Sequence, residues 1–327
     1  MKYQSEQLQS FSKQIDFVLE NYTPHNFKAS QFRNIIAGGL GGSGIGSRIA
    51  KVLFSEILPL PMEVISDYNL PAYADGKTLV VLSSYSGNTE ETLAMFDAAF
   101  AKGCTIICIT TGGKLMAKAT AQGIKIYGAV PGFQPRMALG YPLSTLILLL
   151  GELCGKDFSQ ELRKISDKVS NSAFYTERGK AIFDPYSKVI GKKFVFITDQ
   201  YLEPVALRTC QQIQENAKGE AFLIVVPESN HNVIETFYGS FNTNFVLLHS
   251  NKHPRVKLRF DFLRSHFTAK SYTFTEQIIS DFNMETCYET IYMMDWFTLW
   301  LADAKKQNSI GIANINALKK YLEEHES

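Results

Sequence analysis

Short apolar runs alternate with longer amphipathic stretches along the first half of the chain. The runs have the length and β-branched content of buried strands, whereas the stretches between them carry apolar side chains at helical spacing. Strands are predicted at 34–37, 62–65, 78–82, 105–109 and 124–127, and helices near 44–57, 88–102 and 114–122. This alternation is typical of a parallel sheet that helices cover on both faces.

The same pattern restarts after a polar helix and linker at about 156–188. Strands are predicted at 193–197, 221–226 and 244–248, and helices near 203–216, 254–266, 284–305 and 313–323. We therefore predict an α/β protein that consists of two doubly wound parallel-sheet domains of similar topology. The N-terminal domain is expected to span residues 1–155, and the C-terminal domain residues 156–327.

Composition narrows the class of protein. The 327 residues are 45% hydrophobic and 20% charged with a net charge of +1, so neither a nucleic-acid-binding surface nor an acidic tail is indicated. No signal peptide is predicted, and the most apolar stretch (143–154) is too short to span a membrane. Five cysteines without a C-x-x-C pair are typical of a reducing compartment. We expect a cytoplasmic protein without nucleic-acid or membrane partners.

A glycine-rich segment follows the first predicted strand, from Gly38 to Gly46. Glycines between a strand and a helix allow backbone N–H groups to approach an anion, which the helix N-terminus favours. Gly39, Gly41 and Gly44 also satisfy the G-x-G-x-x-G pattern, and Asp67 after the second strand could bind a ribose. A nicotinamide-dependent oxidoreductase is therefore one alternative.

A second candidate loop follows the third predicted strand and contains the hydroxyls of Ser84, Ser86 and Thr89. Hydroxyls and free amides at a helix N-terminus form a cradle for a phosphate monoester. An ordinary capping box is the alternative, but it accounts for one hydroxyl and one acid rather than three hydroxyls and a glycine. A dinucleotide enzyme would need only the glycine-rich loop, so this second loop favours a phosphorylated substrate.

The segment Ser84-x-Ser86-Gly-Asn-Thr89-x-Glu-Thr resembles the phosphate loop of sugar isomerase domains. With the upstream Gly41-Gly-Ser-Gly-Ile-Gly46, it is similar to the bifunctional phosphoglucose/phosphomannose isomerases, and the resemblance covers about 35–320. It implies two sugar isomerase domains and a hexose 6-phosphate substrate, with no cofactor and no metal. The corresponding loop of the second half, 249–255, lacks the phosphate signature, so one phosphate site per chain is expected.

The resemblance also implies roles for individual residues. Arg136 would stabilise an enediolate oxygen, and Glu215 would be the catalytic base. His231 and Lys319 would assist opening of the sugar ring, with Lys320 adjacent to the latter. Taken alone, Arg136, Glu215 and Lys319 are more typical of solvated surface positions. The residues expected to contact the phosphate or the sugar are Gly42, Ser43, Ser84, Tyr85, Ser86 and Thr89.

The function that follows is interconversion of fructose 6-phosphate with glucose 6-phosphate, and with mannose 6-phosphate as a second aldose, through a cis-enediol. Both aldoses share this intermediate because C2 loses its configuration in it. The resemblance further implies a homodimer in which His231 crosses the interface. Asn308-Ser309 and Val233 depart from the family pattern. A non-catalytic sugar-phosphate sensor is the other alternative.

Overall fold

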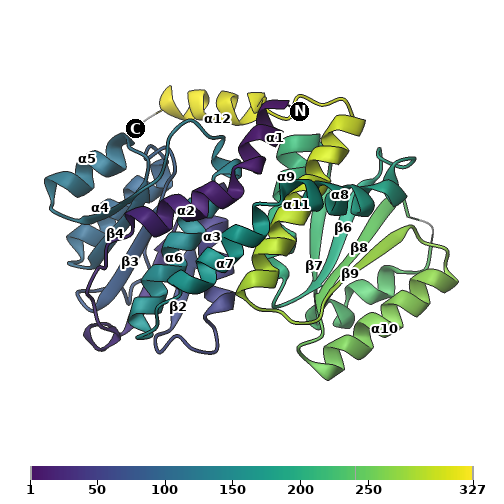
Figure 1. The fold of residues 1–327 in the computed structure, drawn as a ribbon, viewed down its shortest axis with the longest axis horizontal. Coiled ribbons are helices and arrows are strands. Elements are labelled where there is room, and N and C mark those ends of the chain that lie inside the picture. The colour runs from purple at the N-terminus through teal and green to yellow at the C-terminus, as the bar shows by residue number, and fades with distance from the viewer. Residues whose placement is uncertain (1, 240, 326–327) are drawn as a thin grey trace.

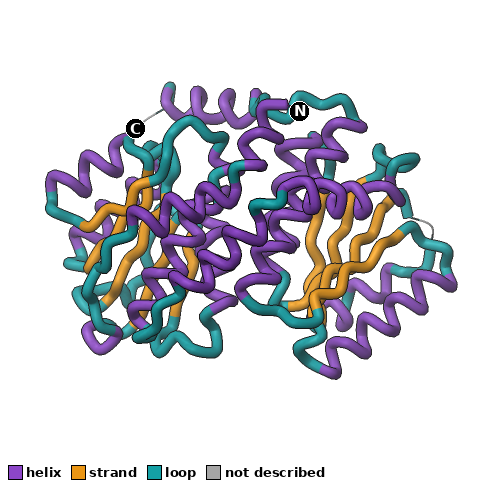
Figure 2. Tube along the Cα trace, viewed as in Figure 1, coloured by secondary structure: helices purple, strands orange, loops and turns teal. Residues whose placement is uncertain are grey.

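The computed structural model describes residues 2–239 and 241–325 and contains two parallel sheets, one in each half of the chain (Figures 1 and 2). The first sheet has the order β2-β1-β3-β4-β5 and the second the order β7-β6-β8-β9. The strands of the first sheet are β1 (Asn34–Gly38), β2 (Met62–Ile65), β3 (Thr78–Ser83), β4 (Thr105–Thr110) and β5 (Lys125–Gly128). Those of the second are β6 (Lys193–Asp199), β7 (Ala221–Val226), β8 (Thr243–Ser250) and β9 (Phe274–Ile279).

The two sheets share one topology, which confirms the predicted fold class. In each sheet the first strand lies between the second and the third, so the chain winds in both directions from it. All neighbouring strands are parallel. β3 and β8 are buried along their whole length, because helices cover both faces of the sheets.

Strand β9 was not predicted from the sequence. It pairs with β8 and forms an edge of the second sheet. Its sequence, Phe-Thr-Glu-Gln-Ile-Ile, mixes polar and apolar residues, and most of its side chains are only half-buried. A strand of this kind lacks the continuous apolar run by which the buried strands were recognised.

Twelve helices and five short 3₁₀ turns connect the strands within the described residues. The helices are α1 (Lys2–Gln9), α2 (Phe11–Asn21), α3 (Gly41–Leu53), α4 (Glu90–Ala101), α5 (Gly113–Ala121), α6 (Gly140–Leu153), α7 (Ser159–Val169), α8 (Ser172–Phe183), α9 (Glu203–Ala217), α10 (Pro254–Ala269), α11 (Met284–Ala304) and α12 (Ala313–Glu323). The turns are η1 (Ala29–Gln31), η2 (Pro135–Met137), η3 (Asp184–Tyr186), η4 (Glu228–His231) and η5 (Val233–Thr236). The segment predicted as one helix and a linker contains two helices, α7 and α8, each with a buried apolar stripe.

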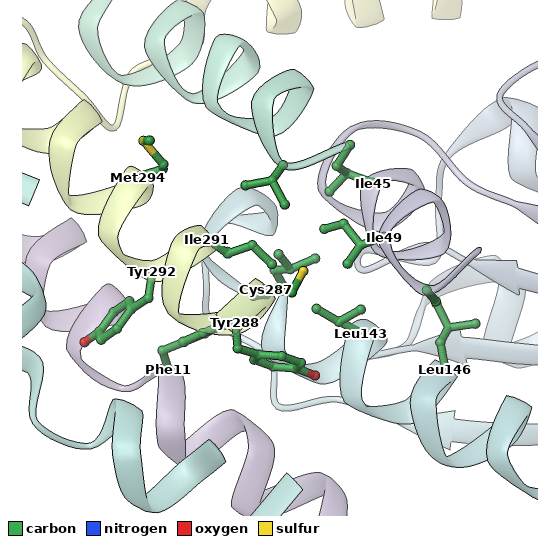
Figure 3. Packing of buried hydrophobic residues seen from close by; sticks show 14 of the residues in the cluster. Phe11, Ile45, Ile49, Leu143, Leu146, Cys287, Tyr288, Ile291, Tyr292 and Met294 are labelled. Carbon is green, nitrogen blue, oxygen red and sulfur yellow. The ribbon is translucent and has the colours of Figure 1, made fainter. Parts of the chain in front are cut away.

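One apolar core continues from the first half into the second. Helix α6 is buried on nearly all sides, and Figure 3 shows its side chains meeting those of α3 and α11. A polar contact crosses the same layer, since Oγ of Ser144 lies 2.9 Å from the hydroxyl of Tyr288. The two sheets are thus joined through packed helices, and the boundary at residue 155 stays a prediction.

Candidate active site

Two loops of the first half meet at the carboxyl edge of its sheet. β1 and β3 are neighbours in the sheet but not consecutive in the chain, and open parallel sheets bind ligands in the crevice at such a position. The loop after β1 leads into α3, and the loop after β3 leads into α4. The backbone N–H of Tyr85 donates to Oγ of Ser43 at 3.1 Å. This bond joins the two predicted anion loops into one structure.

The hydroxyl-rich loop leads directly into the N-terminus of α4. Oγ of Ser84 lies 2.8 Å from Oγ1 of Thr89 and accepts from the N–H of Gly87 at 3.1 Å. Ser84 is buried, Thr89 is half-buried and Ser86 is exposed. Thr89 is the N-cap residue of α4, yet its side chain makes no capping hydrogen bond. The capping alternative therefore does not explain these hydroxyls, and the loop can present them to a ligand.

Close backbone contacts account for the glycines of both loops. A Cβ on Gly42 would lie 2.7 Å from the carbonyl oxygen of Pro135, and one on Gly44 would lie 2.3 Å from that of Gly39. Gly87 has a φ of +68°, and its Cβ would lie 1.8 Å from the carbonyl oxygen of Gly112. Of the G-x-G-x-x-G glycines, Gly39 and Gly44 are thus required by close backbone packing, and Gly41 by its φ of +52°, so the spacing does not by itself indicate a dinucleotide.

Arg136 and Glu215 come together where the two halves meet. Nη1 of Arg136, in η2, lies 3.1 Å from Oε2 of Glu215, in the last turn of α9. Arg136 also donates from Nε to Oδ1 of Asn216 at 2.9 Å and from Nη2 to the carbonyl of Ser309. The side chain of Arg136 is 4% exposed and that of Glu215 is 29% exposed. Burial lowers the pKa of Arg136, and the carboxylate of Glu215 opposes this effect. The result is a fixed cation beside a carboxylate that solvent can reach.

A buried polar network behind this pair was missed by the sequence analysis. Asp295 of α11 accepts two hydrogen bonds from Arg208 of α9, at 3.0 and 2.6 Å, and one from Gln212 at 3.2 Å. Arg208 donates further to the backbone carbonyl of Arg136 at 2.7 Å. Asp295 and Arg208 are 2% and 3% exposed. An acid within the otherwise apolar stretch of α11 was the one available signal, because buried charges are nearly always paired.

Lys218 is a second residue that the sequence analysis did not select. It ends α9 with a left-handed φ of 49°, and its Nζ donates to the carbonyls of Glu215 and Gly311, at 2.5 Å each. Burial and the nearby Arg136 lower the pKa of Lys218, whereas Glu215 raises it. Its position three residues after the predicted base was the only signal in the sequence.

His231 lies at the opposite end of a strand from Glu215. Glu215 precedes the amino end of β7, and His231 follows its carboxyl end in η4. The six residues of β7 span about 17–20 Å at roughly 3.3 Å per residue. His231 is exposed, and no described residue hydrogen-bonds its side chain. The fold of one chain therefore does not bring these two residues together.

Lys319 lies on α12, which has no buried residue. Figure 1 shows α12 running along the top of the molecule in that view, with its C-terminal end towards α5. The side chains of Lys319 and Lys320 are both exposed. The segment before α12 contacts Arg136 through the carbonyl of Ser309, and it contacts Lys218 through the carbonyl of Gly311.

At the equivalent position of the second half, a carboxylate of the chain itself bonds the nearby backbone amides. Asp199, at the end of β6, accepts from the N–H and the Oγ of Ser250, at 2.6 Å each. Its other oxygen accepts from the N–H groups of Tyr201 and Leu202, at 3.0 Å each. The backbone amides of Tyr201, Leu202 and Ser250 are thus already bonded within the chain, and one phosphate site per chain stays a prediction.

Among residues 2–239 and 241–325, no three His, Cys, Asp or Glu side chains are grouped so that they could hold a metal ion. In the same part of the chain, no helix combines the length and the apolar character needed to cross a bilayer.

Comparison with known proteins first defines the class. Glucosamine-6-phosphate deaminase from Thermotoga maritima has the same fold, with a TM-score of 0.72 over 94% of this chain and 95% of that one, at 14% identity. Residues 187–322 match the family described as the bacterial phospho-glucose isomerase C-terminal SIS domain. The chain is therefore a protein of the sugar isomerase fold.

Two relatives then identify the family within this class. The chain is 31% identical to the bifunctional phosphoglucose/phosphomannose isomerase of Aquifex aeolicus, over 90% of this chain and 92% of that protein. It is 33% identical to the protein of the same name from Caldicellulosiruptor bescii, over 91% and 92%. The chain belongs to the bifunctional phosphoglucose/phosphomannose isomerase family, as the sequence motifs predicted.

Proposed function

We propose that this protein isomerises fructose 6-phosphate to glucose 6-phosphate and mannose 6-phosphate through a cis-enediol, without a metal or cofactor. The observation that carries the proposal is the Arg136–Glu215 pair beside the anion loops. Nη1 of Arg136 lies 3.1 Å from Oε2 of Glu215, and the backbone of Arg136 packs against Gly42. A carboxylate, a fixed cation and a phosphate cradle are the parts that this reaction needs.

In this proposal the substrate phosphate binds at Ser84, Ser86 and Thr89, at the start of α4. Thr89 makes no capping bond, so an anion at this place can accept from the hydroxyls and from the first-turn amides. The sugar then lies against Gly42, Ser43 and Tyr85. Tyr85 is well placed for this, because its hydroxyl is fixed by Val130 at 2.7 Å and by Phe133 at 2.9 Å.

Glu215 moves the proton in the proposed reaction. It removes the proton from C1 of the open-chain ketose and delivers it to C2 of the enediol, or the reverse from an aldose. Delivery to one face of C2 gives the glucose product, and delivery to the other face gives the mannose product. Arg136 stabilises the enediolate oxygen, since its guanidinium is fixed by Asn216 and Ser309 before the substrate arrives.

A homodimer with His231 supplied by the second subunit completes the proposed site. Glu215 and His231 flank β7 at its two ends, so a histidine that acts beside Glu215 has to come from another copy. The exposed side chain of His231 is free to enter a partner's site, and two-fold dimers are the commonest assemblies. There it would assist ring opening together with Lys319.

A single incubation tests the proposed activity. Fructose 6-phosphate and the protein, without added metal or dinucleotide, should yield both aldose phosphates. A non-catalytic sensor would bind the sugar phosphate and form neither product. A nicotinamide-dependent oxidoreductase would change the absorbance of added dinucleotide and would need it for any turnover.

A further inference from the structure

Three side chains from distant parts of the sequence hold the segment between α11 and α12. Nε2 of Gln4, in α1, donates to the carbonyl of Ser309 at 2.5 Å, and Nη2 of Arg136 donates to the same oxygen. Nζ of Lys218 donates to the carbonyl of Gly311 at 2.5 Å. We call residues 309–311, with these donors, the C-terminal clamp.

Packing does not fix the helix that follows the clamp. No residue of α12 is buried, and its large apolar side chains are 37% to 57% exposed (Ile315 40%, Leu318 57%, Tyr321 57% and Leu322 37%). Within the part of the chain that the structure describes, the direction of α12 is therefore set mainly where it leaves the clamp. Any function of Lys319 depends on that direction.

Lys218 is suited to connect the clamp with the catalytic pair. The same ammonium donates to the carbonyl of Glu215 and to that of Gly311, so one cation joins the end of α9 to the clamp. Residue 218 also has a left-handed φ of 49°, a conformation in which helices usually end with glycine. Its side chain reaches the last turn of α9, where Nζ donates to the carbonyl of Glu215.

We propose that Lys218 is a positioning residue that, through the C-terminal clamp, fixes the direction of α12 and thereby presents Lys319 to the site of Glu215. The inference rests on the proposed function for the role of Lys319. In this proposal Lys218 affects the site indirectly, through α12, because its ammonium donates to two backbone carbonyls. The ordering of α12 by Lys218 does not depend on the reaction and is measured separately.

The test compares Lys218→Met with Lys218→Arg and with the control Lys270→Met, an exposed lysine at the end of α10. Amide hydrogen exchange of residues 313–323 should become faster in Lys218→Met and stay unchanged in the control. Turnover of fructose 6-phosphate should fall roughly 10- to 100-fold in Lys218→Met, as for a misplaced catalytic group, with little change in KM. Lys218→Arg, which keeps a cationic donor, should recover most of the turnover.

The variant Lys319→Ala separates positioning from direct action. On that background, Lys218→Met should cause almost no further loss of turnover, because both changes remove the same contribution. An equally large loss on both backgrounds would overturn the proposal, and so would unchanged exchange in α12. If the parent protein fails to isomerise fructose 6-phosphate, the proposed function fails, while hydrogen exchange still decides whether Lys218 orders α12.

Discussion

Arg136 and Glu215 are 79 residues apart in the sequence, yet Nη1 of the arginine lies 3.1 Å from Oε2 of the glutamate. The arginine follows the last strand of the first sheet, and the glutamate precedes the second strand of the other sheet. The carboxyl edge of one sheet thus meets the amino edge of the other. Neither half alone contains both the cation and the carboxylate of the proposed site.

Glu215→Gln should lower turnover by roughly 10²–10⁴ with little change in KM, because it removes the base and keeps its shape. The amide oxygen can still accept from Arg136, so the fold should persist. Steady-state kinetics with fructose 6-phosphate measures this effect. Glu203→Gln, at the start of the same helix, is the matched control and should keep parental turnover. Near-normal turnover in Glu215→Gln would rule out this base.

Ser86→Ala combined with Thr89→Ala should weaken binding of fructose 6-phosphate by a few kcal/mol. Each lost hydrogen bond to a charged group contributes roughly 1.5–3 kcal/mol. Isothermal titration gives the affinity, and inorganic phosphate should compete in the parent protein. Ser170→Ala with Thr268→Ala is the control, because these exposed hydroxyls donate only to nearby carbonyls of their own helical segments. Equal affinity in the Ser86/Thr89 variant and the parent would place the phosphate elsewhere.

Asp295→Asn should destabilise the fold by about 3–5 kcal/mol, because it leaves the buried guanidinium of Arg208 without its counter-charge. Urea unfolding measures the change. The control is Asp97→Asn, whose carboxylate pairs with Lys118 at 2.7 Å on the exposed surface. Asp97→Asn should lower the free energy of unfolding by less than about 1 kcal/mol. Similar losses of unfolding free energy in the two variants would show that the buried Arg208–Asp295 pair contributes no more than a surface ion pair. It would then not stabilise the position of Arg136.

The buried strands and the two loops that follow β1 and β3 were predictable because their signals are local. A continuous apolar run followed by glycines or hydroxyls needs no knowledge of the rest of the fold. Strand β9 was not predicted, because its side chains are a mixture of polar and apolar ones and most are only half-buried at the sheet edge. The contact of Arg208 with Asp295 joins residues 87 positions apart, so only the packing of α9 on α11 reveals it.

The residues of the candidate site also divide into those that the sequence could predict and those that only the fold reveals. The family resemblance selected both Arg136 and Glu215, and the fold places them in contact. It also selected His231 and Lys319, whose side chains are exposed in the single chain. No local signal marked Lys218, because its hydrogen bonds go to backbone carbonyls, one of them 93 residues away.

Mixing the Glu215→Gln and His231→Ala chains tests the shared site of the proposed homodimer. Under conditions that reassort subunits at random, half of the dimers should be mixed, and each should contain one site with both residues intact. The mixture should therefore recover about a quarter of the parental activity. Absence of recovery despite verified subunit exchange would mean that the histidine does not act across an interface.

The central claim is that Glu215 transfers a proton between C1 and C2 of a hexose 6-phosphate through an enediol. Proton NMR of fructose 6-phosphate incubated with the protein in D₂O, followed over many turnovers, tests it most directly. The account predicts that glucose 6-phosphate and mannose 6-phosphate both form with deuterium at C2, and that Glu215→Gln slows this labelling together with product formation. Aldose products that still carry protium at C2 after many turnovers, or no aldose product at all, would contradict it.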